Sequence, residues 1–211
     1  MIKLNSWQIV QITILSICVV ICATIFVGFF QQIPITSGSI AIDWKQIWPS
    51  IEGATVRYST GLKFAPWSAF LVSPLGLLSL SASWGLMAFI TILILLISVP
   101  RIRQRRRYWF SILLLIMSFP SLRHMIDGNF EGLIIAGAVL SVYGYNHRQP
   151  FALAAGLLLM SSKPQSGTVF FAVIGLYALL QLRQYEYRRF WITTALTVAA
   201  VVIPFMFWKV I

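Results

Sequence analysis

The sequence predicts an all-α fold: a polytopic bundle of transmembrane helices with about seven spans and one broken or re-entrant segment on the outer side. Of the 211 residues, 59% are hydrophobic and only 10% are charged, whereas roughly a quarter of the residues in a soluble domain are charged. The mean hydropathy is +0.85, and apolar runs of helix length recur with almost no charge inside them. Soluble enzymes, disordered tails and secreted disulfide scaffolds are therefore excluded.

The spans are predicted from apolar runs that can cross the hydrocarbon core as helices. The first run, Trp7 to Phe30, would reach about 36 Å as a helix and lacks a small-residue cleavage site, so we expect it to be a retained first span. Six later runs, several of them short, complete the set: Trp84 to Val99, Tyr108 to Phe119, Phe130 to Tyr145, Pro150 to Ser162, Thr168 to Leu182 and Phe190 to Trp208. No linker divides the chain, so residues 1–211 are expected to form one integral membrane domain.

The apolar stretch from Phe64 to Leu80 differs from these runs because Pro66, Pro74 and Gly76 interrupt it. Proline removes a backbone donor and breaks the helical hydrogen-bond ladder. In lipid, other groups would have to satisfy the freed backbone. We expect this segment to be broken, re-entrant or interfacial, and to follow an outer loop with short interfacial helices over residues 31–63.

The positions of the 16 lysine and arginine residues favour one topology. With a cytoplasmic N-terminus and a non-crossing segment 64–80, ten of them lie inside and six outside; if that segment crosses, four lie inside and twelve outside. Inner loops of membrane proteins carry the excess of basic residues, so the first arrangement is favoured. We therefore expect a multi-pass protein of the cell membrane with a cytoplasmic N-terminus. An outer N-terminus with eight full spans, which puts twelve inside, also satisfies the rule and stays open.

A net charge of +11 would suggest nucleic acid as a partner for a soluble chain. Here the arginines cluster within residues 101–107 and 183–189, directly beside apolar segments. Anionic lipid headgroups and the positive-inside bias account for such clusters, so we expect membrane lipids and no nucleic acid as partners. Cys18 and Cys22 lie four residues apart in an apolar run, which predicts packing positions on one helix face and no redox or metal site.

Three polar segments meet on the outer face in the favoured topology: the loop from Gln31 to Lys63, the turn at residues 120–129 and residues 161–165. At this face lie four of the five acidic residues, Asp43, Glu52, Asp127 and Glu131, and two basic residues at span ends, Arg123 and Lys163. Acids and bases gathered at one membrane face indicate a functional site.

Asp43 is the candidate catalytic residue. It lies in a short stretch with apolar and aromatic residues on one side, which is typical of a helix on the bilayer surface. A carboxylate partly removed from water there would accept a proton readily, as a general base must. The alternative is a solvated loop aspartate.

Arg123, His124 and Asp127 lie where a span ends. A charged side chain there costs a few kcal/mol unless it is paired or solvated, so we expect Arg123 to pair with Asp127 or with a ligand phosphate. The Asp127-Gly128 dipeptide alternatively marks only a turn. His124 has no second nitrogen or sulfur ligand nearby, so no zinc site is expected.

Lys163 precedes Pro164 between two apolar runs. This pattern predicts either a tight hairpin whose lysine extends to the interface or a phosphate contact at the outer leaflet. The sequence contains no phosphate-binding glycine loop, catalytic-serine pattern or metal-ligand pair, so we expect no cofactor and no metal.

The order of several short motifs resembles a known family. After the aspartate of the first outer loop come Phe-Ala-Pro-Trp, Ser-Pro-Leu-Gly-Leu-Leu, Ser-Phe-Pro, Asp-Gly-Asn-Phe-Glu-Gly-Leu and Ala-Ala-Gly-Leu-Leu-Leu-Met-Ser-Ser-Lys-Pro-Gln. Over residues 7–182 this is similar to the polyprenyl-phosphate-sugar-dependent membrane glycosyltransferases of the GT-C fold, most closely the mannosyltransferase-like glycosyltransferase family 87. The chain corresponds to the N-terminal module of that fold.

The resemblance implies a transferase that moves a sugar, mannose-like, from a polyprenyl-phosphate carrier to an acceptor on the outer membrane face, with inversion and without a nucleotide sugar. It implies that Asp43 is the catalytic base and that Lys163 occupies the family's Lys-Pro turn. Asn129 and Glu131 stand where the family usually has Gln and Asn. The candidate substrate-binding residues are Arg123, His124, Asp127, Asn129 and Lys163.

Two other readings remain. Family members are longer than this chain. One alternative is therefore a non-catalytic membrane subunit or scaffold of a larger complex, and an active protein would be expected to act with a second membrane subunit. A small transporter would need polar residues near span centres, and these are scarce.

Overall fold

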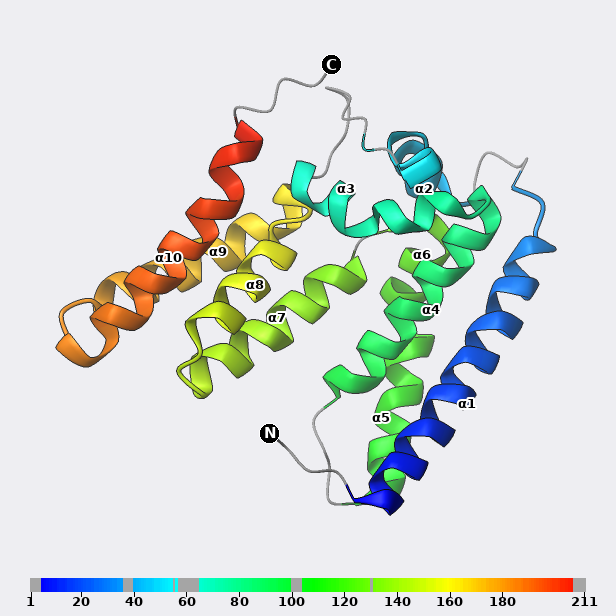
Figure 1. The fold of residues 1–211 in the computed structure, drawn as a ribbon, viewed down its shortest axis with the longest axis horizontal. Coiled ribbons are helices and arrows are strands. Elements are labelled where there is room, and N and C mark those ends of the chain that lie inside the picture. The colour runs from blue at the N-terminus through cyan, green and yellow to red at the C-terminus, as the bar shows by residue number, and fades with distance from the viewer. Residues whose placement is uncertain are drawn as a thin grey trace.

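The computed structural model describes residues 5–35, 40–54, 56, 65–99, 104–129 and 131–206. Within these ranges the regular structure is entirely helical, which confirms the all-α prediction (Figure 1). Every apolar run expected to span forms a helix there: α1 (Ser6–Gln31), α4 (Leu80–Ser98), α5 (Arg105–Met117), α7 (Glu131–Asn146), α8 (Pro150–Met160), α9 (Pro164–Gln181) and α10 (Tyr185–Met206). Shorter elements connect them: α2 (Ile42–Ile47), η1 (Trp48–Ser50), η2 (Glu52–Ala54), α3 (Pro66–Val72), η3 (Ser73–Leu77) and α6 (Phe119–Asp127).

Three helices in the described ranges, α1, α4 and α10, are long and apolar enough to cross a membrane. The pair α5 and α6, which meets at a bend of 46°, would make a fourth span, and α8 and α9 are shorter apolar helices. In Figure 1 the seven longer helices run alternately toward and away from the end that carries α2, α3 and α6. The chain is thus a membrane-helical bundle, while the count of seven crossings stays a prediction.

The segment before α4 is broken, as its prolines and glycine predict. Helix α3 ends at Val72, a 3-10 turn continues to Leu77, and α4 begins only at Leu80. Gly76 lies directly against the Ile51 carbonyl, where a Cβ would not fit. The broken segment therefore packs against Ile51 and Ala54 of the preceding loop and does not form one continuous helix.

Helices α7 and α8 pack closely through small residues. Gly137, Ser141 and Gly144 follow one another along a single face of α7 and meet α8. A Cβ on Gly137 would lie 2.6 Å from the Gly156 carbonyl oxygen. Small residues at such positions let two helix backbones approach in lipid. This contact brings the start of α7 beside the turn that ends α8.

Helix α1 contacts the bundle mainly at its C-terminal end. Phe30 packs edge-on against Trp84 of α4, with ring centroids 4.5 Å apart, and covers Gly85. The apolar window of α1 is otherwise unburied. Cys18 and Cys22 are exposed on this surface, which corrects the expectation that they pack within the bundle, because in this stretch Val19 and Ala23 are the partly buried residues.

The topology can be tested with single cysteines at two exposed positions. Gln32 follows α1 and Gln104 precedes α5. With Cys18 and Cys22 replaced by alanine, a membrane-impermeant maleimide should label Gln32→Cys in intact cells and Gln104→Cys only after permeabilisation, because the basic residues place these ends on opposite sides. Labelling of both positions from the same side would contradict the topology.

Candidate functional site

The three polar segments expected on one face do meet at one end of the bundle. The Ala41 backbone N–H, just before α2, donates to the Ile126 carbonyl of α6 at 2.9 Å. The Ala65 N–H, just before α3, donates to the Ser162 carbonyl at 2.8 Å. A side-chain bond from Lys163 links the α8–α9 turn to the segment after α6. Residues far apart in the sequence thus form one polar cluster.

Two buried tryptophans close on the end of α6. The Trp44 indole donates to the Ser83 hydroxyl at 2.8 Å, and the Trp84 indole donates at 2.8 Å to the Met125 carbonyl, which lies in the last helical turn where carbonyls lack intrahelical partners. Gly128 ends α6 in the left-handed conformation, with φ of 69°. A Cβ there would lie 2.5 Å from the Trp44 Cβ. The Asp-Gly turn therefore fixes how α2 sits on α6.

Asp43 lies in the first turn of α2, next to the fully buried Trp44. Its side chain is half-buried. Within the described ranges, no hydrogen bond or ion pair engages its carboxylate. A short helix forms around Asp43 as expected, and the carboxylate is available to an incoming group.

Arg123 and Asp127 form the expected pair one helical turn apart on α6. The Arg123 Nε donates to the Asp127 Oδ2 at 2.7 Å, and the arginine side chain is 51% exposed against 16% for the aspartate. The other oxygen, Oδ1, is buried with no hydrogen-bond partner among the described residues. Buried polar atoms nearly always have a partner, so Oδ1 marks a place where a donor is missing.

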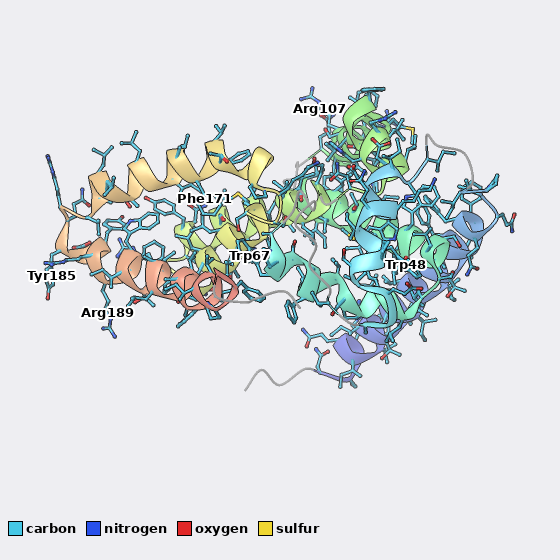
Figure 2. All side chains as sticks on the ribbon, turned by 90° about the horizontal axis from the view of Figure 1, so that it is seen from above. Trp48, Trp67, Arg107, Phe171, Tyr185 and Arg189 are labelled. Carbon is cyan, nitrogen blue, oxygen red and sulfur yellow. The ribbon has the colours of Figure 1, made fainter. Side chains whose placement is uncertain are left out.

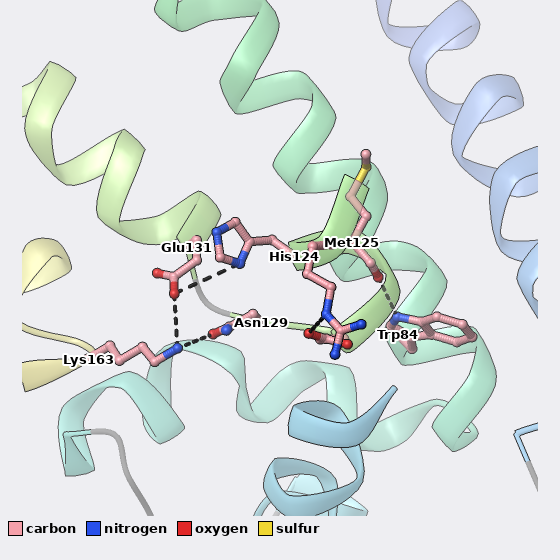
Figure 3. A network of polar contacts seen from close by, with 8 residues as sticks. Trp84, His124, Met125, Asn129, Glu131 and Lys163 are labelled. Carbon is pink, nitrogen blue, oxygen red and sulfur yellow. Dashed lines mark hydrogen bonds and ion pairs between the residues drawn. The ribbon is translucent and has the colours of Figure 1, made fainter. Parts of the chain in front are cut away.

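Glu131 is the centre of a second polar group, which Figure 3 shows. Its Oε1 accepts a hydrogen bond from the Lys163 Nζ at 2.9 Å and lies 3.9 Å from the His124 Nδ1. The same Nζ also donates to the Asn129 Oδ1 at 3.0 Å. All four side chains are partly buried, so the ammonium is held by two partners and does not extend into water.

The sequence placed Glu131 on the same face as Lys163, but Glu131 was not among the candidate substrate-binding residues because its position departs from the family pattern. The structure instead gives Glu131 contacts to two of the candidate residues. No group of three or more His, Cys, Asp and Glu side chains in the described ranges could hold a metal ion.

Two further polar atoms at this end are buried without a partner among the described residues. They are the Trp48 indole Nε1, at the end of α2, and the Ser162 hydroxyl, beside Lys163. With the Asp127 Oδ1 they provide a donor, an acceptor and a hydroxyl.

The apolar helices and this polar end define an integral membrane protein with a candidate site at one membrane face. The chain matches the family model of glycosyltransferase family 87 over residues 64–210, well over half of its length. It therefore belongs to glycosyltransferase family 87, a family of membrane glycosyltransferases. No curated protein and no solved structure matched the chain. The matched range includes the residues on α6, α7 and the α8–α9 turn and begins after Asp43.

The close contact between Gly128 and Trp44 can be tested by comparing an alanine substitution at Gly128 with one at Gly53, a second glycine with a left-handed backbone. Gly53 has φ of 71°, but a Cβ there would meet nothing within 4 Å. Gly53→Ala should cost only the left-handed conformation, about 1–2 kcal/mol. Gly128→Ala should cost at least about 1 kcal/mol more because it also forces Trp44 to move. Unfolding in detergent measures both, and equal losses would contradict the close fit.

Proposed function

We propose that the protein transfers a sugar, mannose-like, from a polyprenyl-phosphate carrier to an acceptor hydroxyl at the outer face of the cell membrane, inverting the anomeric centre. The observation that carries this proposal is the placement of Asp43. Its carboxylate is unpaired among the described residues, while the carboxylates of Asp127 and Glu131 are held by neighbouring cations. The membrane glycosyltransferase family supports the class of reaction.

Asp43 suits the role of general base. A general base needs a lone pair that can reach the acceptor O–H. A carboxylate that already forms an ion pair is a weaker proton acceptor. Asp43 is fixed in position because the next residue, Trp44, is anchored on α4 and α6. It would take the proton as the acceptor oxygen attacks the anomeric carbon from the face opposite the phosphate.

The leaving phosphate would be bound by oriented donors. An ammonium has three N–H groups, and Lys163 uses two of them on Asn129 and Glu131. Arg123 bonds Asp127 through Nε, which leaves its terminal nitrogens for an anion. The two acid–base pairs cancel in formal charge, so charge-assisted hydrogen bonds, and not excess positive charge, would stabilise the phosphate as its bond to the sugar breaks.

The role of Asp43 predicts a loss of transfer when only its proton acceptor is removed. Asp43→Asn keeps the size of the side chain, so transfer from polyprenyl-phosphate mannose to a membrane lipid extract should fall by at least about 10²-fold while donor binding changes little. Glu52→Gln, the same chemical change on an exposed residue of the same loop, should leave transfer close to normal. Equal transfer by Asp43→Asn and the unaltered protein would favour the non-catalytic scaffold.

Lys163 is predicted to act on donor binding. Lys163→Met should raise KM for the polyprenyl-phosphate sugar about tenfold or more, since a charge-assisted hydrogen bond is worth roughly 1.5–3 kcal/mol. It should also lower stability, because Glu131 loses its partner. Lys163→Arg should restore much of the KM. A fall in stability with no change in KM would show that the lysine has only a structural role.

A further inference from the structure

An apolar groove runs between α9 and α10, and one of its ends lies opposite the candidate site, near Leu182 and Trp191. Both helices pack against α8, whose Leu157 also lines the groove, and Figure 2 shows Phe171 beside it. The groove has a volume of about 540 Å³. Small residues on the facing sides keep it open, among them Gly175 and Ala178 of α9 and Ala195 and Ala199 of α10. A Cβ on Gly175 would meet nothing within 4 Å.

The groove shares one lining residue with a basic pocket on the first turns of α10. Ile192 lines both the groove and a second cavity of about 730 Å³, whose other lining residues are Tyr185, Glu186, Arg188, Arg189 and Thr193. The single carboxylate of this pocket already faces a cation, since Glu186 lies 4.0 Å from Arg148 of the α7–α8 turn. No carboxylate of the described residues pairs with Arg188 or Arg189.

The two arginines lie near the start of α10, where the helix dipole is positive and disfavours cations. An anion between them would remove this cost, and arginine binds phosphate through paired hydrogen bonds. Tyr185, which is 89% exposed, is the kind of residue that lies at the level of lipid headgroups. A phosphate at the pocket and a hydrocarbon chain in the adjoining groove are the two parts of one molecule, a phospholipid.

We propose that this end of the protein binds one anionic phospholipid, with its phosphate on Arg188 and Arg189 and an acyl chain between α9 and α10. A free phosphate would leave the apolar groove uncovered. A polyprenyl-phosphate donor would carry its phosphate at the other end of the bundle, beside Lys163. The lipid site therefore does not depend on the proposed reaction.

Native mass spectrometry of the purified protein tests the site with phosphatidylglycerol and phosphatidylcholine of identical chains. The protein should retain one phosphatidylglycerol in preference to phosphatidylcholine. Because each arginine near a membrane surface contributes roughly 1 kcal/mol of attraction to anionic lipid, Arg188→Gln with Arg189→Gln should weaken phosphatidylglycerol binding about 30-fold. The pair Arg105→Gln and Arg106→Gln removes the same charge from exposed positions of α5 and should change binding little.

A third variant tests the groove without touching the arginines. Gly175→Phe fills the open space and should weaken phosphatidylglycerol binding, whereas glycerol 3-phosphate should not displace the lipid. Equal retention of the two lipids, or an equal loss in the α5 control pair, would overturn the proposal. So would unchanged binding by Gly175→Phe together with competition by glycerol 3-phosphate, which would indicate a free-phosphate site.

Discussion

The close approach of Trp44 and Trp84 to the end of α6 determines where the candidate site residues lie. Gly128 allows this approach because it has no Cβ and adopts a left-handed conformation. Trp44 carries Asp43 beside it in the chain, so burial of the indole holds the carboxylate at a half-buried edge. Helix α7 begins three residues after Gly128, which places Glu131 next to α6 as well. The close contact at Gly128, which leaves no room for a methyl group, thus helps to position Asp43 and the two ion pairs.

The membrane imposes the separation of charge along the bundle. Ionisable groups inside hydrocarbon are costly unless they are paired or reach water, and the described acids and bases lie at the two ends of the helices. At the site end, Arg123 with Asp127 and Lys163 with Glu131 form partly buried pairs. Removing one member of such a pair leaves a charge without a partner, so the carboxylates of Asp127 and Glu131 are held in place by their cations. Of the three acids, only Asp43 has a carboxylate that is available for proton transfer. The other end carries exposed arginines that suit anionic lipid.

The sequence predicted the features that depend on local pattern. Apolar runs identified the helices, Pro66, Pro74 and Gly76 identified the broken segment, and the alternation of crossings predicted that Asp43, Asp127 and Lys163 share one face. It did not predict contacts set by lateral packing. Glu131 meets Lys163 because small residues bring α7 against α8, and hydropathy contains no information on which helices are neighbours. For the same reason it did not show that Cys18 and Cys22 lie on an unburied face.

The stereochemistry of the product tests the central claim most directly. The purified protein would be given a polyprenyl-phosphate mannose of known anomeric configuration and a membrane lipid acceptor, and the new glycosidic bond would be assigned by nuclear magnetic resonance. A single displacement assisted by one base, Asp43, predicts the configuration opposite to that of the donor. A product that retains the donor configuration would require a second nucleophile and would contradict the assignment of Asp43 as a general base.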